Sequence, residues 1–68
     1  MRRFRIKGKM YKVIKQLPNA DELLVDEVYL LLDSKKEQYT LLCSPKSYIL
    51  YNSKQQRVAT TYSITELR

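Results

Sequence analysis

The chain contains no histidine and no tryptophan, and it has only one glycine and one cysteine. Without histidine, the commonest side chain for acid–base catalysis near neutral pH is missing. A single glycine, Gly8, excludes the glycine-rich loops that hold phosphate groups in many nucleotide-binding enzymes. The sequence therefore predicts a binding protein that is not an enzyme and that needs no cofactor.

The lone Cys43 excludes a disulfide within the chain, so packing alone must hold the fold, and a reducing, cytoplasmic compartment is expected. Cys43 lies in a segment with strand-like alternation and has no histidine to activate it. It is predicted to be a small core residue and not a nucleophile. The carboxylates of Asp21, Glu22, Asp26 and Glu27 lack the spacing of a calcium loop, and we interpret them as a solvated acidic edge with no metal.

Long hydrophobic runs are also absent. No apolar stretch is long enough to span a bilayer, and the first residues alternate charged with bulky side chains, unlike a signal peptide. With 68 residues, 44% hydrophobic and 29% charged, the chain has the composition of one small folded domain spanning residues 1–68. A chain of this length buries only about 60% of its unfolded surface, so its stability margin is small.

What the sequence does contain is alternation with period two. Residues 3–7 alternate strictly, which predicts a strand with Phe4 and Ile6 toward the core and the cations on the opposite face. Residues 10–16 form a second such segment, and Gly8 lies between the two, where a positive φ or a bulge is possible. The two segments are interpreted as a hairpin or as one long bent strand.

The most apolar stretch, residues 25–32, has two interpretations. Ala20, Leu23, Leu24, Val28 and Leu31 recur at helical spacing, with Asn19 in the capping position. An unbroken apolar run followed by polar turn residues is instead typical of a strand buried on both faces. We favour a strand over residues 27–33 with residues 19–24 as a loop or short helical turn; the alternative is one helix over residues 19–33 packed on an antiparallel sheet, an α+β fold.

Turn residues recur about every ten positions from Asp33 onward, the cadence of an antiparallel meander or small barrel. Strands are predicted over residues 38–43, 48–51 and 57–62, and a turn of helix over residues 63–67 with Leu67 on the core. No internal repeat is expected. The predicted fold is mainly β, a curled antiparallel sheet or barrel of five or six strands, on the scale of small SH3-like and Sm-like barrels, which it resembles only in size and strand rhythm.

Charge is segregated along the chain, whose net charge is +6. The first fifteen residues hold seven cations and no anion, and residues 16–34 hold five anions and no cation. A local positive field near the N-terminal strand is therefore expected. Such a field attracts either nucleic acid or an acidic protein surface, and the separation of signs also permits self-association into a homo-oligomer.

The N-terminal segment is the strongest candidate for a functional surface. Alternate cations on one face of a strand lie about 6.6 to 7 Å apart, the scale of phosphate spacing along a flexible single strand. Tyrosines, if exposed, can stack on bases. The candidate binding residues are Arg3, Arg5, Lys7, Lys9, Lys12, Tyr11, Tyr48 and Tyr51. The expected function is single-stranded DNA or RNA binding; the alternative is an adaptor, inhibitor or accessory subunit that docks its basic face on an acidic partner protein.

Overall fold

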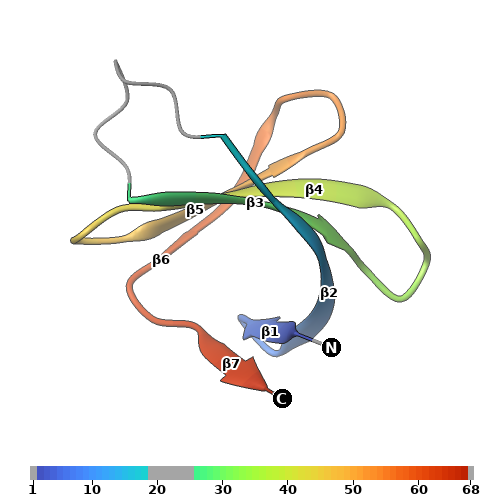
Figure 1. Cartoon of the computed structure of the whole chain (residues 1–68), viewed down its shortest axis with the longest axis horizontal. Helices are drawn as coiled ribbons and strands as arrows, with labels where there is room; N and C mark the ends of the chain where they lie inside the picture. The colour runs from blue at the N-terminus through green and yellow to red at the C-terminus, as the bar shows by residue number, and fades with distance from the viewer. Residues whose placement is uncertain (1, 19–25, 68) are drawn as a thin grey trace.

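The fold is a single curled sheet. The structure, a computed structural model, describes residues 2–18 and 26–67. In this part of the chain the strands are antiparallel and lie in the order β6-β5-β4-β3-β2-β1-β7, forming a half-barrel (Figure 1). Their bounds are β1 Arg3–Ile6, β2 Lys9–Leu17, β3 Glu27–Leu32, β4 Gln38–Cys43, β5 Tyr48–Asn52, β6 Arg57–Thr61 and β7 Thr65–Leu67. The mainly β class is confirmed, with seven strands where five or six were predicted.

The central apolar run is β3, so the strand interpretation is confirmed and the helix is wrong for residues 27–32. Its predicted continuation over residues 19–25 lies outside the described residues. β3 pairs with β2 on one side and β4 on the other. A central strand has neighbours at both edges and side chains to cover on both faces, which is why its sequence is almost continuously apolar.

The C-terminal segment is also a strand, so the predicted helical turn over residues 63–67 is wrong. β7 pairs with the free side of β1, with Leu67 opposite Arg3 and Thr65 opposite Arg5. Leu67 thus shares the face of Arg3, and Ile64 packs against the core in its place. Three residues are too few for a period-two signal, and the unpaired edge of β1, a distant segment, determines their conformation.

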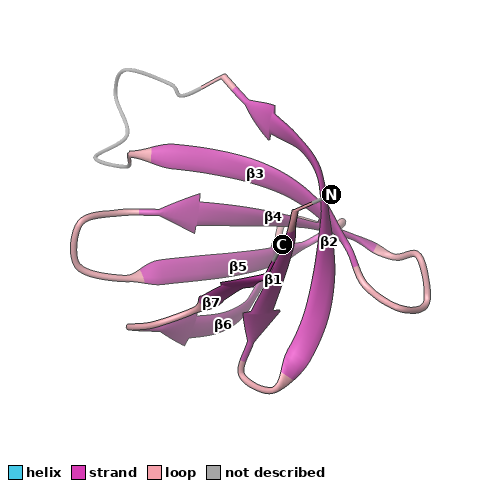
Figure 2. Ribbon diagram, turned by 60° about the horizontal axis from the view of Figure 1, so that its bottom comes forward, coloured by secondary structure: helices cyan, strands magenta, loops and turns pink. Residues whose placement is uncertain are grey.

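The inner face of the curl forms the hydrophobic core, around which the strands bend (Figure 2). The core cluster takes one side of every strand from β1 to β5, and it consists of Phe4, Ile6, Tyr11, Tyr29, Leu31, Leu41, Cys43 and Leu50. Phe4 contacts Tyr29, and Tyr11 contacts Tyr39, each edge to face with ring centroids 5.3 Å apart. These contacts join β1 and β2 to the middle of the sheet.

The sheet curls without the several glycines that usually allow tight bending. Two register shifts each place an extra residue in a ladder: Ile14 in β2, between Val13 and Lys15, and Val58 in β6, because the consecutive residues Leu50 and Tyr51 of β5 pair with Ala59 and Arg57. Bulges of this kind bend a strand and increase its twist. In β2 the extra residue, Ile14, is 43% exposed. The curvature therefore comes from bulges in place of glycine.

The first hairpin turn uses the only glycine. Lys7 and Gly8 both have positive φ, 51° and 82°, and Ile6 pairs with Lys9 across them. Two positive φ values in a two-residue loop define the type I′ turn, whose twist matches that of the flanking strands. The hairpin interpretation of residues 3–16 is confirmed.

The β3–β4 and β5–β6 loops are built alike. Asp33 Oδ1 accepts the backbone N–H groups of Lys35 and Glu37, and Asn52 Oδ1 accepts those of Lys54 and Gln56, at 2.9–3.0 Å. The fourth residue of each loop has positive φ, 65° at Lys36 and 64° at Gln55. The segments around them, YLLLDSK from Tyr29 and YILYNSK from Tyr48, align without a gap and are identical at four of their seven positions. The two loops therefore share one conformation.

Core truncation tests this packing. Leu31 and Ile6 are 0% and 1% exposed, so Leu31→Ala and Ile6→Ala are each expected to lower the free energy of unfolding by about 2 to 4 kcal/mol. Ile14→Ala, at the exposed bulge, is the matched control and should cost less than about 1 kcal/mol. Urea denaturation followed by tyrosine fluorescence measures all three, and equal losses for the three variants would contradict the assigned core.

The thiol of Cys43 gives the stability a pH dependence. Burial, aided by the charges of Glu27 and Asp26, raises the pKa of this 7% exposed thiol to about 11. From about pH 9 to 11 the unfolded chain therefore loses a proton that the folded chain keeps, and the free energy of unfolding falls as pH rises. In urea denaturation at pH 8 and pH 10, Cys43→Ala should show a smaller fall than the wild type. If the free energy of unfolding falls equally in the variant and the wild type, the pH dependence comes from groups other than Cys43.

Candidate anion-binding surface

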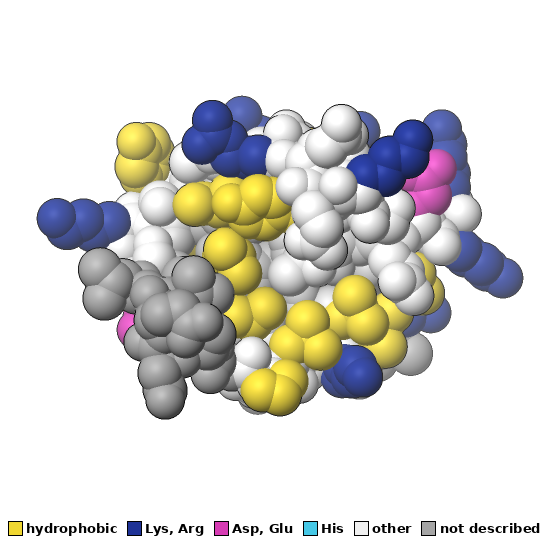
Figure 3. All heavy atoms as spheres, turned by 90° about the horizontal axis from the view of Figure 1, so that it is seen from above, with side chains coloured by type: hydrophobic (Ala, Val, Ile, Leu, Met, Phe, Trp, Pro, Cys, Tyr) yellow, Lys and Arg dark blue, Asp and Glu magenta, His cyan; other side chains and the backbone are white. Residues whose placement is uncertain are grey.

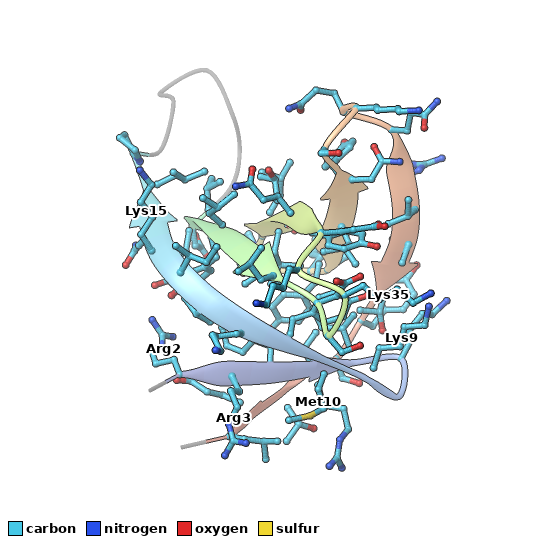
Figure 4. All side chains as sticks on the ribbon, turned by 90° about the vertical axis from the view of Figure 1, so that its right-hand side faces the viewer. Arg2, Arg3, Lys9, Met10, Lys15 and Lys35 are labelled. Carbon is cyan, nitrogen blue, oxygen red and sulfur yellow. The ribbon has the colours of Figure 1, made fainter. Side chains whose placement is uncertain are left out.

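Two arginines of β1 lie on the outer face of the sheet. β1 alternates exposed and buried residues, so Arg3 and Arg5 point away from the core that Phe4 and Ile6 enter. The β1–β2 register places Lys12 directly opposite Arg3, and Met10 opposite Arg5. Figure 4 shows Arg3 and Met10 projecting away from the interior of the half-barrel. Three cations from two strands thus share one surface.

The outer face carries positive charge alone at its described strand positions. The two strand carboxylates that could oppose it, Glu27 and Glu66, pair with Cys43 and Phe4 and so belong to the inner face. Glu37 is in a loop. The outward strand charges are Arg3, Arg5, Lys12, Lys15 and Arg57. The described outward strand positions therefore form a surface with one sign of charge.

A shallow hollow of about 410 Å³ lies on this face between β1, β2 and the β3–β4 loop. Arg3, Lys12 and Lys36 line it, and Met10 and Leu32 supply apolar surface. The hollow thus combines three cations with apolar side chains, which suits a ligand with both an anionic group and a flat or apolar part.

One carboxylate, Asp33, also lines the hollow. The backbone N–H of Glu37 and then that of Lys35 donate to it and hold its pKa below the usual range, so it is ionised at neutral pH. Its Oδ1 is occupied by these two donors within its own loop. Asp33 therefore shapes the loop that carries Lys36, and the three cations outnumber it.

Arg2 is a fourth cation nearby, but it is engaged within the fold. Its Nε donates to Glu66 Oε2 at 2.7 Å and its Nη2 to Glu66 Oε1 at 3.1 Å. The guanidinium also lies 4.8 Å from the ring centroid of Tyr29 and 5.5 Å from that of Phe4. These contacts, the Glu66 carboxylate above all, raise its pKa further. Arg2 therefore fastens β7 to the core and is not offered to a ligand.

Lys7 and Lys9, predicted to join the same surface, lie elsewhere. Lys7 is in the β1–β2 turn. Lys9 opposes Ile6 and lines a separate hollow of about 580 Å³ with Lys35 and the carboxylates of Asp33 and Glu37; Figure 4 shows Lys9 and Lys35 together at the hairpin ends. The positive charge of Lys9 is therefore partly balanced by its neighbours.

The three candidate tyrosines are divided between the faces. Tyr11 is 5% exposed and packs against Tyr39, so its ring has no free face for a base. Tyr48 opposes Cys43 on the inner side and lines a hollow with Asp26 and Glu27. Tyr51 is half-buried on the outer side, opposite Thr40. Of the three, Tyr51 alone shares a face with Arg3.

Five residues of the hollow were not among the predicted site residues: Met10, Leu32, Asp33, Ser34 and Lys36. Leu32 lies next to Lys12 because these two residues pair across β2 and β3, and Lys36 follows in the β3–β4 loop. Residues 18–26 separate the two strands in the sequence. No local pattern in the sequence encodes that register. The alternation of residues 10–16 indicates that Met10 and Lys12 lie on the same face. The thioether of Met10 carries no charge, so no binding role was predicted for it.

Other kinds of site find no support in the described residues. They contain no group of three or more potential metal ligands, and no helix among them is long and apolar enough to cross a membrane. Comparison of the chain with protein-family models, with curated proteins and with solved structures gives no match. Its function is therefore argued from its own residues.

The assignment of Arg2 to the fold leads to a prediction. Arg2→Ala is expected to lower the free energy of unfolding by about 1 to 2 kcal/mol, since it removes a partly exposed two-point ion pair and a cation–π contact. Arg5→Ala, which removes an exposed cation of the same type, should change it by less than about 0.5 kcal/mol. Thermal unfolding of both variants compares them directly. A larger loss for Arg5→Ala would reverse the two assignments.

Proposed function

We propose that the protein is a non-enzymatic binding module that holds the phosphate backbone of a single-stranded nucleic acid on the outer face of β1 and β2. Arg3, Arg5 and Lys12 contact phosphates, and Lys36 reaches the same strand from the β3–β4 loop. The observation that carries the proposal is the pairing of Arg3 with Lys12 on a face whose described strand positions hold no carboxylate.

Like charges directly opposite each other on neighbouring strands destabilise a sheet. Arg3 and Lys12 occupy such a pair, and the ion pair that the described residues do form, between Arg2 and Glu66, lies on the other side. An anion between Arg3 and Lys12 would turn this repulsion into two attractions. A polyanion gains the most, because each phosphate that a cation neutralises also releases counterions.

A single strand fits this surface better than a duplex does. The hollow lined by Arg3 and Lys12 also has apolar surface, from Met10 and Leu32, on which an unpaired base can lie while its phosphate reaches the cations. In a duplex the bases are stacked and paired, so only the backbone would touch this surface. Tyr51, farther along the same face, offers a second ring contact.

Binding is expected to depend steeply on salt. If three or four phosphates are neutralised on a single strand, log affinity should fall with log salt with a slope of roughly −2 to −3. Arg3→Ala with Lys12→Ala should weaken binding of a fluorescent mixed-sequence 12-nucleotide DNA or RNA at least tenfold and make the slope shallower by roughly 1.4. Fluorescence anisotropy between 25 and 300 mM salt measures both quantities.

The matched control is the double variant Lys46→Ala with Lys54→Ala, which removes two cations from loops outside the proposed surface. Its net charge equals that of the Arg3→Ala, Lys12→Ala variant. The control should lose less than threefold. Equal losses in the two double variants would mean that binding follows net charge and not a surface, and absence of binding by the wild type at 25 mM salt would refute the proposal.

A further inference from the structure

A strip of hydrophobic side chains crosses the outer face of β3, β4 and β5, beside the hollow described above. Val28, Leu42 and Ile49 form one row across the three strands, and Leu30 and Tyr51 belong to the next row, on either side of Thr40. Leu30, Leu42, Ile49 and Tyr51 are only partly buried. Figure 3 shows hydrophobic side chains across the middle of this face, with mainly Lys and Arg side chains at its margins and an Asp or Glu side chain beside them at one edge.

The strip lies between two cations. Lys15 of β2 opposes Leu30 at one side, and Arg57 of β6 opposes Tyr51 at the other. The described strand positions of this face contain no carboxylate, because Glu27 and Glu66 point to the inner side. An apolar patch with a polar margin marks an interaction surface, and the sign of the margin selects an acidic partner.

The dimensions favour one shape of partner. Neighbouring strands are about 4.8 Å apart, so β2 and β6 are about 19 Å apart measured along the curled sheet. An α-helix with its side chains is about 10 to 12 Å wide. A helix seated on β3, β4 and β5 would cover the apolar strip and leave Lys15 and Arg57 just beyond its two sides.

We propose that this face docks an amphipathic α-helix of a partner protein, with an apolar stripe toward Leu30, Leu42 and Ile49 and acidic residues along both flanks toward Lys15 and Arg57. The helix supplies the second layer that a sheet with an apolar face requires. A second copy of the chain is a poorer occupant, because a face whose strand charges are all positive would meet another of the same kind.

Apart from Tyr51, this surface consists of residues other than those of the proposed nucleic-acid site, and the variants that test it, at Lys15, Arg57 and Ile49, leave Arg3 and Lys12 in place. The probe is a synthetic fluorescent peptide of about 18 residues with leucines at helical spacing and glutamates on both flanks. The first comparison peptide has lysine in place of glutamate, and the second has the leucines and glutamates scrambled. Binding is measured by fluorescence anisotropy, and the peptide's helicity by circular dichroism.

The Leu/Glu peptide should bind and gain helicity, and the two comparison peptides should bind at least tenfold more weakly. Lys15→Glu with Arg57→Glu should weaken binding at least tenfold, as should Ile49→Ser, while Arg5→Glu, on the same face but outside the strip, should change it less than threefold. Because Lys15 and Arg57 are exposed, their replacement tests docking even if Ile49→Ser lowers stability.

Three outcomes would overturn the proposal. Equal binding of the scrambled peptide would show attraction to charge without a helical stripe. Binding to vesicles of phosphatidylserine and phosphatidylcholine without binding to the peptide would assign the strip to a membrane surface. A dimer in size-exclusion chromatography that Ile49→Ser dissociates would assign it to a second copy of the chain.

Discussion

The structure depends on one constraint: a single sheet has to enclose its own core. No helix or second sheet covers it within the described residues, so the strands must bend until the side chains of one face meet across the interior. The aromatic contacts between β1 and β3 and between β2 and β4 show that closure. Because a strand sends alternate residues to opposite faces, curling also fixes which residues can reach a ligand.

This constraint explains why the core-facing residues of β1 and β3 could be predicted from the sequence, whereas β7 could not. The alternation of Phe4 and Ile6 with arginines is local, and it correctly indicated strand, core and outward cations. The run in β3 was recognised by its length and its turn residues. β7 could not be found, because three residues adopt a strand only where the edge of β1 is available to them.

The candidate site shows the same limit. The outward direction of Arg3 and Arg5 follows from their spacing, whereas the meeting of Lys12 with Arg3 depends on the turn at Lys7 and Gly8, and the approach of Lys36 depends on the register between β2 and β3. Tyr11 has an aromatic ring that could stack on a base, but its position opposite Phe4 places that ring in the core. Composition identified the kind of residue, and register determined which of them share a surface.

The paired loops provide an internal comparison of charge. They share one backbone arrangement, but the oxygen that accepts two N–H groups belongs to a carboxylate in Asp33 and to an amide in Asn52. The depressed pKa of Asp33 means that its loop is favoured while the carboxyl is ionised, and this advantage is lost as pH falls through that pKa. Asn52 does not titrate. Strong acid should consequently destabilise the β3–β4 loop and leave the β5–β6 loop unchanged. The β5–β6 loop is thus an uncharged reference, within the same chain, for the effect of a carboxylate on the stability of this turn.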